Sequence, residues 1–114
     1  MQTKYRVKFW AHESGEKPVA KWMKTLSEND REYLGDLLRE LALDGPFYRP
    51  KVFKHLEGSL WEIKDKRSPG VGYRIYFGFD GNYICLVLAA GEKSSQDRDI
   101  KIAKIRLNLS KEKK

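Results

Sequence analysis

The chain has 114 residues and a net charge of +7 at neutral pH, and 40% of its residues are hydrophobic. This length predicts one domain with its own core, and this composition excludes a disordered chain. The positive charge favours partners such as nucleic acid or an acidic protein, although it can also serve solubility alone.

Three sequence features bear on the location of the protein in the cell. The longest apolar run, residues 84–90, is too short to cross a bilayer, and residues 5–10 alternate charged with apolar side chains, unlike a signal peptide. The single cysteine, Cys85, excludes a disulfide within the chain. We therefore expect a cytoplasmic protein that makes no membrane contact.

The first half of the chain predicts one strand and two helices. Residues 5–10 alternate as a half-buried strand. Helical spacing of apolar residues follows at 18–26, and a capping box at Ser27–Asp30 begins a second helix that ends at Gly45 and Pro46. The two apolar stripes are Val19, Trp22, Met23 and Leu26, and then Tyr33, Leu34, Leu37, Leu38 and Leu41.

The second half predicts three strands and a last helix. Residues 60–66 and 73–79 alternate, residues 67–72 have loop composition, and the Asp80–Asn82 turn predicts a hairpin. Residues 83–90 are apolar on both faces, which predicts a central strand that is covered on both sides. A wide apolar stripe then predicts a helix from about residue 94, with residues 111–114 frayed.

The resulting order is β-α-α-β-β-β-α within a single domain spanning residues 1–114. Hairpin-linked strands pair antiparallel, and helices gather on one side of such a sheet. The sequence therefore predicts an α+β fold with a mostly antiparallel four-stranded sheet and helices packed on one side of it.

Polar side chains gather on the face opposite to the predicted core. Glu62 and Lys64 share the exposed side of one strand, and Arg74 and Tyr76 share that of the next. If these strands pair, the four side chains form one surface. Further polar residues that we expect around it are Lys54, Lys66, Arg67, Lys93 and Gln96.

This set of residues suits phosphodiester chemistry. An arginine holds a phosphate through two donors, a lysine adds charge, and a tyrosine stacks on a base or relays a proton. Glu62 is the only carboxylate placed to act as a general base. The competing interpretation is a solvated sheet face with weak cross-strand ion pairs.

Other chemistries have less support. His12 and His55 lie far apart in the sequence, and neither has a second ligand at metal-binding spacing, so we expect no metal and no cofactor. Cys85 lies in the most apolar strand, which predicts a buried and unreactive thiol.

Three segments of the chain carry a resemblance to a known family. They are LEGSLWEIK at residues 56–64, GVGYRIYFG at 70–78 and AAGEKSSQDRDIKIAK at 89–104. The chain resembles the RelE/ParE superfamily of toxins from type II toxin–antitoxin systems. It looks most like the addiction module killer branch, close to HigB-like proteins, over residues 5 to about 109.

The resemblance implies a RelE-like fold and a bacterial or phage-derived toxin that a cognate antitoxin neutralises. RelE-like members cut mRNA on the ribosome without a metal, by attack of a 2′-hydroxyl on the adjacent phosphate. Arg74 takes the position of their phosphate-binding arginine, Lys64 that of an assisting lysine, and Lys93 is the nearest match to a third basic residue. Glu62 stands where RelE has another lysine, and the C-terminal tyrosine of RelE and the C-terminal histidine and tyrosine of HigB have no counterpart.

We therefore expect Arg74, Lys64, Glu62, Tyr76 and Lys93 to be catalytic, and Lys66, Arg67, Gln96 and Lys54 to bind RNA. Two alternatives stay open. ParE-like members use the same scaffold to inhibit DNA gyrase, so the fold alone does not identify the target. The chain can also be a domain without toxicity that only binds an antitoxin.

Overall fold

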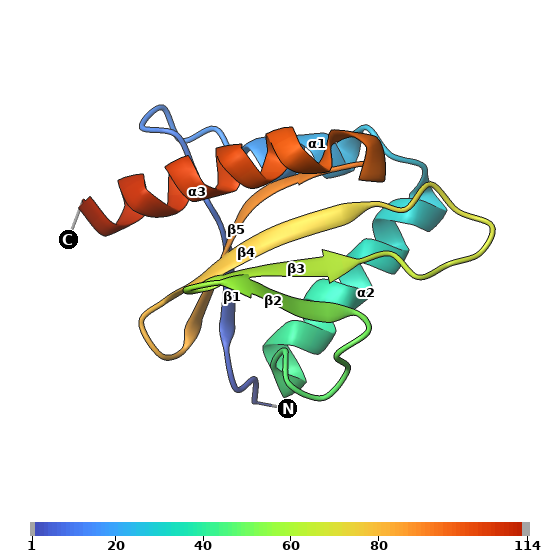
Figure 1. Ribbon diagram of the computed structural model, residues 1–114, viewed down its shortest axis with the longest axis horizontal. Coiled ribbons are helices and arrows are strands. Elements are labelled where there is room, and N and C mark those ends of the chain that lie inside the picture. The colour runs from blue at the N-terminus through green and yellow to red at the C-terminus, as the bar shows by residue number, and fades with distance from the viewer. Residues whose placement is uncertain (1, 113–114) are drawn as a thin grey trace.

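The structure, a computed structural model, describes residues 2–112 as one sheet with helices on both of its faces (Figure 1). In chain order the elements are β1 (Arg6–Phe9), α1 (Pro18–Lys24), α2 (Glu28–Asp44), β2 (Phe53–Glu57), β3 (Leu60–Lys64), β4 (Arg74–Asp80), β5 (Ile84–Gly91), the short 3-10 helix η1 (Lys93–Ser95) and α3 (Gln96–Glu112).

The sheet has five strands in the order β1-β5-β4-β3-β2. β1 runs parallel to β5, and the other neighbours are antiparallel. The expected four-stranded sheet therefore lacks one strand, β2. This edge strand was not predicted because three of its five residues, Lys54, His55 and Glu57, are exposed and polar, so that no apolar alternation marks it.

Helices α1 and α2 cover one face of the sheet, as their apolar stripes predicted. Leu34, Leu37, Leu38 and Leu41 of α2 are buried against residues of β3, β4 and β5. The N-cap half of the predicted capping box is confirmed, since the Ser27 hydroxyl accepts a hydrogen bond from the Asp30 backbone N–H at 3.2 Å.

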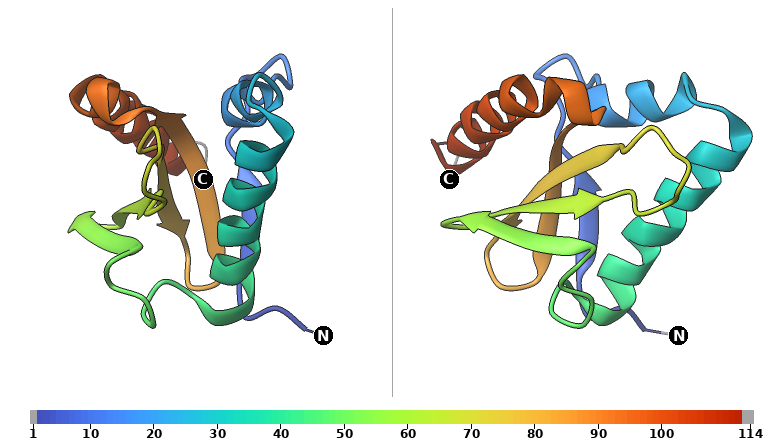
Figure 2. Two further views of the ribbon diagram at one scale, coloured as in Figure 1. Left: turned by 90° about the vertical axis from the view of Figure 1, so that its right-hand side faces the viewer. Right: turned by 45° about the vertical axis from the view of Figure 1, so that its right-hand side comes forward.

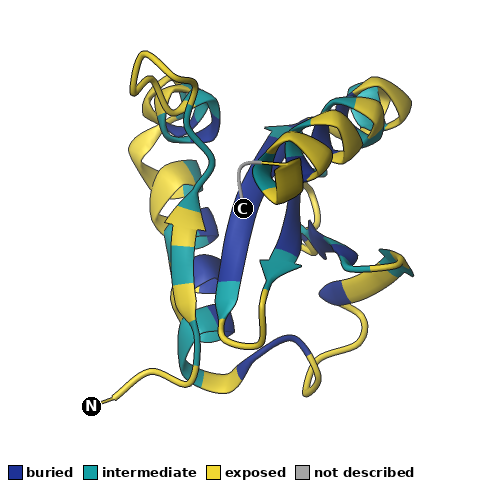
Figure 3. Ribbon diagram, turned by 90° about the vertical axis from the view of Figure 1, so that its left-hand side faces the viewer, coloured by how far each residue is buried: buried dark blue, intermediate teal, exposed yellow. Residues whose placement is uncertain are grey.

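Helix α3 covers the opposite face, so the prediction of helices on one side only is wrong. Figure 2 shows α3 across the sheet from α1 and α2, and Figure 3 shows β5 buried along most of its length between them. Ala103 and Leu107 of α3 pack on Leu60, Tyr76, Leu86 and Leu88 in a second core. The physical reason is that β5 is apolar on both faces, and each face has to be covered.

The contact between α3 and the sheet is close at Gly78. A Cβ added there would lie 2.8 Å from Leu107 Cδ1, so a side chain at this position would force the Leu107 side chain to shift. A β-bulge in the β4–β5 ladder lies nearby, and Arg106 Nη1 donates a hydrogen bond of 2.8 Å to the Leu88 carbonyl oxygen. The Arg106 guanidinium also lies over the Trp10 ring.

Residues 111–114 were predicted to be frayed, and the structure describes two of them. Helix α3 continues to Glu112, so residues 111 and 112 are helical, and residues 113–114 lie outside the described residues. Within residues 2–112, each helix is too short or too polar to cross a membrane.

Candidate functional site

Strands β3 and β4 pair and bring the predicted polar residues into adjacent rows. Lys64 lies directly opposite Arg74, and Glu62 lies opposite Tyr76. On its other side Glu62 is paired with Lys54 of β2. The rows lie on the face of the sheet that α3 partly covers, because α3 packs on β4 and β5 and starts at Gln96, which reaches Glu62.

Glu62 lies at the centre of this cluster. It is buried, whereas the sequence predicted that it would be exposed. Its side chain is 1% exposed, and its Oε2 accepts a hydrogen bond of 2.7 Å from Gln96 Nε2. Its Oε1 lies 3.9 Å from both Lys64 Nζ and Arg74 Nε, and it makes no hydrogen bond within the described residues. One buried carboxylate therefore faces two cations.

The orientation of Arg74 is fixed by the backbone beside it. Its Nη1 donates to the carbonyl oxygens of Gly72, at 3.1 Å, and Tyr73, at 3.4 Å. Its side chain is only 12% exposed, and its Nε is buried without a hydrogen-bond partner in the described part of the chain. Arg74 thus keeps donor capacity that no described residue uses.

Tyr76 is also buried, contrary to the prediction that it faces solvent. Helix α3 covers this residue in the second core, and its hydroxyl has no hydrogen-bond partner among residues 2–112. Burial, together with the nearby charge of Glu62, raises the pKa of Tyr76 well above its usual value. The phenol is therefore neutral at neutral pH and is not poised to accept a proton.

Three of the predicted lysines are exposed. Lys54 lies on β2, Lys66 follows β3, and Lys93 begins η1. The Cβ of Lys93 approaches Gly72, the residue whose carbonyl holds Arg74. Lys54, the ladder partner of Glu62, and Lys93 add positive charge beside the cluster. The backbone N–H of Lys66 instead contacts the Tyr33 hydroxyl of α2.

Lys66 shares a cavity with two basic residues that sequence reasoning did not select. Arg49 and Lys51 line this cavity, and Arg49 also forms an ion pair of 2.5 Å with Glu40. The signal available in the sequence was the run of basic residues between Arg49 and Lys54.

Arg67, by contrast, is engaged inside the protein. Its guanidinium donates to Asp65 at 2.8 and 3.0 Å and to Asp30 at 2.9 Å, and it lies over the Tyr33 ring. These carboxylates raise the pKa of Arg67. The arrangement favours a structural role that ties the loop after β3 to α2, and RNA contact by Arg67 stays a prediction.

The carboxylates around Arg67 were not predicted from the sequence. Desolvation opposes their ionisation, but the hydrogen bonds from Arg67 outweigh it, so the pKa values of Asp30 and Asp65 lie below their usual range. Tyr73 donates its hydroxyl to Asp30 at 3.1 Å. Only the short Asp65–Arg67 spacing was available as a signal in the sequence.

The remaining groups with reactive side chains do not form a site. Within residues 2–112, no three or more His, Cys, Asp and Glu side chains gather in a way that could hold a metal ion. Cys85 is buried in β5, and desolvation raises the pKa of its thiol to about 12. As predicted, this cysteine is placed in the core and not at the surface.

The geometry of the cluster indicates an anion site. Like charges directly opposite each other in a sheet are destabilising, and Lys64 and Arg74 are such a pair. Glu62 offsets one of the two charges, which leaves an excess of one positive charge beside further lysines. A bound phosphate would supply the missing negative charge and accept the donors that Arg74 has free.

Comparison with known proteins gives one family. The model of the family described as "Phage derived protein Gp49-like (DUF891)" matches residues 21–108. This family is associated with toxins of type II toxin–antitoxin systems of the RelE/HigB-like kind. A search of curated proteins found no significant match. The matched range contains the whole cluster and helices α2 and most of α3.

Proposed function

We propose that this chain, which belongs to the phage-derived Gp49-like family, is the toxin of a type II toxin–antitoxin module and cleaves mRNA on the ribosome. A cognate antitoxin neutralises it. The reaction needs no metal and no small-molecule cofactor, and it takes place in the cytoplasm, where the chain acts as a single domain. The family match supports the toxin and its antitoxin partner, and the cluster described above supports the chemistry.

The observation that carries this proposal is the pair of cations on β3 and β4 that share one carboxylate. Lys64 and Arg74 lie opposite each other, with a single buried carboxylate, Glu62, at 3.9 Å from each. A chain selected only for stability would not place like charges in this position. Such an arrangement is typical of a site that binds a phosphate.

In the proposed reaction the 2′-hydroxyl oxygen of one nucleotide attacks the adjacent phosphorus. The new O2′–P bond forms as the P–O5′ bond breaks, and the products carry a 2′,3′-cyclic phosphate and a 5′-hydroxyl. The proton of the 2′-hydroxyl leaves to a base, and the 5′ oxygen gains a proton. Arg74 binds the non-bridging oxygens, on which negative charge develops, and Lys64 and Lys93 add positive charge.

Glu62 holds Lys64 and Arg74 in place, and Tyr76 has a packing role. The carboxylate and the phenol are both fully buried, so proton transfer to Glu62 from an RNA hydroxyl would first require Lys64 or Gln96 to move. We therefore assign Glu62, with Gln96 fixing its carboxylate, to the orientation of Arg74. Tyr76 fills the core below them.

The exposed lysines bind the rest of the RNA in this proposal. Lys54, Lys66 and Lys93 are exposed and can each contact a backbone phosphate. Such contacts add affinity without sequence preference, and they weaken as the salt concentration rises.

The test is induced expression of the chain and of Arg74→Ala in bacteria, with primer extension on a translated mRNA. We expect growth arrest and cuts within codons for the unchanged chain. Arg74→Ala should remove both, because the phosphate loses its main ligand, with a loss of activity of at least about 100-fold. Circular dichroism of the purified variant checks that it is folded.

Arg39→Ala is the matched control, because Arg39 is an exposed arginine of α2 away from the cluster. It should keep both the arrest and the cuts. Cuts that persist in folded Arg74→Ala would exclude the role of Arg74. Arrest without any cut in mRNA would exclude the nuclease.

The burial of Glu62 and Tyr76 favours a second candidate, an inhibitor of DNA gyrase without nuclease activity. Binding to gyrase requires no exposed acid–base pair, unlike RNA cleavage. The contact surface would lie on α3, where Lys101 and Lys104 are exposed, while Arg106 is held against Trp10. This candidate predicts DNA damage signalling with intact mRNA, and a domain that only binds an antitoxin predicts neither effect.

A further inference from the structure

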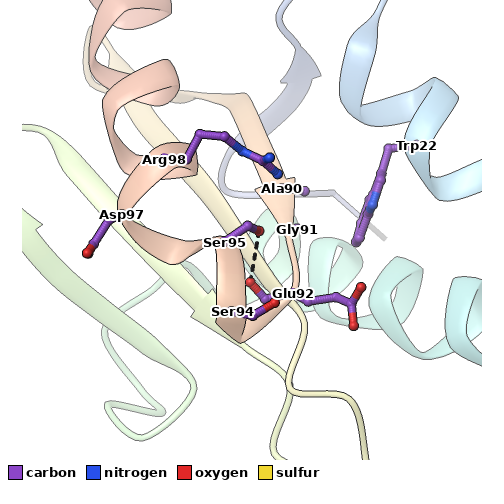
Figure 4. A pocket seen from close by; sticks show the side chains of 8 residues that line it. All are labelled: Trp22, Ala90, Gly91, Glu92, Ser94, Ser95, Asp97 and Arg98. Atoms are coloured by element: carbon purple, nitrogen blue, oxygen red, sulfur yellow. Dashed lines mark hydrogen bonds between the residues drawn. The ribbon is translucent and has the colours of Figure 1, made fainter.

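A cavity of about 620 Å³ lies next to the cluster, between α1 and the start of α3 (Figure 4). This volume is within the range of small-molecule sites, about 300–1,000 Å³. Its lining residues come from α1, from the end of β5 and from the turn that leads through η1 into α3. They are Trp22, Ala90, Gly91, Glu92, Ser94, Ser95, Asp97 and Arg98.

Two flat side chains lie on opposite sides of this cavity. Trp22 is half-buried, and its ring makes an edge-to-face contact with the ring of Tyr73, with centroids 5.5 Å apart. Arg98 stands across the cavity, and its guanidinium extends toward the side of Trp22 (Figure 4). An indole and a guanidinium that line the same cavity offer two flat groups on which a planar ring can stack.

The polar groups of the cavity exclude a phosphate. Glu92 and Asp97 carry two negative charges. The only cation among the described residues that line the cavity, Arg98, lies 3.6 Å from the Asp99 carboxylate, so the surroundings carry an excess of negative charge. The Glu92 carboxylate extends toward the side of the cavity on which Trp22 lies (Figure 4). A carboxylate only accepts hydrogen bonds, so the ligand has to present donors.

The cavity and the anion site share the turn between β5 and α3. Lys93 and Gln96 lie toward the anion site, where Lys93 approaches Gly72 and Gln96 binds Glu62. Glu92, Ser94 and Ser95 of the same turn line the cavity. Gly91, at the cavity wall, is the ladder partner of Arg74. A ligand with a phosphate at Arg74 could therefore place an adjoining flat group in the cavity.

We propose that this cavity binds one nucleobase of the RNA, with guanine preferred. The base stacks between Trp22 and Arg98, and Glu92 accepts hydrogen bonds from it. Guanine fits best because its N1–H and its 2-amino group are adjacent donors that one carboxylate can accept together, whereas uracil offers a single donor. This inference rests on RNA as the substrate of the neighbouring anion site, and it adds a site that selects the base.

The test is a titration of the isotopically labelled chain with GMP, AMP, CMP and UMP, followed by NMR. The four nucleotides share the same phosphate, so differences between them report the base. We expect the indole N–H signal of Trp22 to move most with GMP, with an affinity at least about fivefold higher than with UMP. Glu92→Gln keeps the shape of the side chain and should lower the GMP affinity about tenfold.

Two further variants keep the result interpretable. Glu13→Gln changes an exposed carboxylate outside this cavity and should leave the titration unchanged. Arg74→Ala removes the phosphate contact and should leave the GMP-over-UMP preference at Trp22 intact. The inference is overturned if the four nucleotides shift Trp22 equally, if Glu92→Gln binds GMP as before, or if shifts occur only around Arg74.

The expression experiment separates this inference from the proposed nuclease. Cleaved mRNA together with no base preference at Trp22 overturns the base pocket and keeps the nuclease. A clear GMP preference at Trp22 with uncut mRNA supports the pocket and overturns the nuclease. A preference that Glu92→Gln removes, together with changed cleavage sites in that variant, supports both.

Discussion

At the scale of single residues, the feature that needs explanation is a buried carboxylate shared by two cations. Glu62 is 1% exposed, and Lys64 and Arg74 approach the same oxygen. A buried charge is costly unless it is paired and hydrogen-bonded. The charge of Glu62 is paired with Lys64 and Arg74, and its second oxygen accepts a hydrogen bond from Gln96. The cations therefore depend on Glu62 for their position.

We expect Glu62→Gln to lower the free energy of unfolding by about 1–3 kcal/mol. The amide preserves the size of the side chain and one acceptor for Gln96, but it leaves Lys64 and Arg74 opposite each other without a counter-charge. Urea denaturation at neutral pH measures the change.

Glu13→Gln serves as the control for that measurement. Glu13 is exposed, and its replacement should change the stability by less than about 0.5 kcal/mol. If Glu62→Gln unfolds at the same urea concentration as the unchanged chain, Glu62 does not compensate the two cations.

The candidate site was only partly predictable from the sequence. Alternation was sufficient to place Lys64 and Arg74 on one face of adjacent strands, and the register confirms that they meet. The burial of Glu62 and Tyr76 was not predictable from alternation, because a polar side chain on the second face of a strand reads as exposed unless another element covers it. The hydrogen bond from Arg67 to Asp30 could not be predicted for a different reason, because these residues lie 37 positions apart in the sequence.

At the scale of elements, the position of α3 decides which face of the sheet is free. Leu107 fits against Gly78, where any side chain on the strand would collide with it, and Ala103 is completely buried beside it. Helix α3 thereby turns half of the predicted open face into a second core, and its first residue, Gln96, reaches Glu62. Packing of this helix and the geometry of the anion site are thus linked.

We expect Leu107→Ala to lower the free energy of unfolding by about 2–4 kcal/mol, because it removes a buried side chain and leaves a cavity over Gly78. Leu109→Ala on the same helix is the matched control. Leu109 is 41% exposed, so its truncation should cost less than about 1 kcal/mol. Thermal denaturation followed by circular dichroism compares the two, and equal effects would show that α3 is not anchored through Leu107.

The elements themselves were largely predictable, with two exceptions. Both long helices, the Asp80–Asn82 hairpin and the central strand β5 follow directly from apolar periodicity and turn residues. Strand β2 was missed because its exposed residues are polar and it depends on β3 for its pairing. The side on which α3 packs was also missed, because periodicity shows that a helix has an apolar face but does not identify its partner.

At the scale of the whole molecule, a chain with a charge of +7 has to limit repulsion among its cations. Asp30 and Asp65 contribute to this by binding Arg67, and with Tyr73 they join the loop after β3 to α2. The same loop carries Gly72, whose carbonyl oxygen orients Arg74. Carboxylates outside the anion site therefore support both the fold and the position of its arginine.

This arrangement predicts that acid destabilises the chain. The pKa values of Asp30 and Asp65 are lower in the folded state than in the unfolded state, so around pH 4 the unfolded state binds more protons. Their contribution is complete above the unfolded pKa, and it is lost as the pH falls through the folded value. Urea denaturation at about pH 6 and about pH 3 should show a lower free energy of unfolding at the acidic pH. Asp65→Asn should be less stable at about pH 6 and should lose less on acidification, because one titrating carboxylate is gone. An equal loss in Asp65→Asn and the unchanged chain would mean that other carboxylates, not those bound to Arg67, determine the acid response.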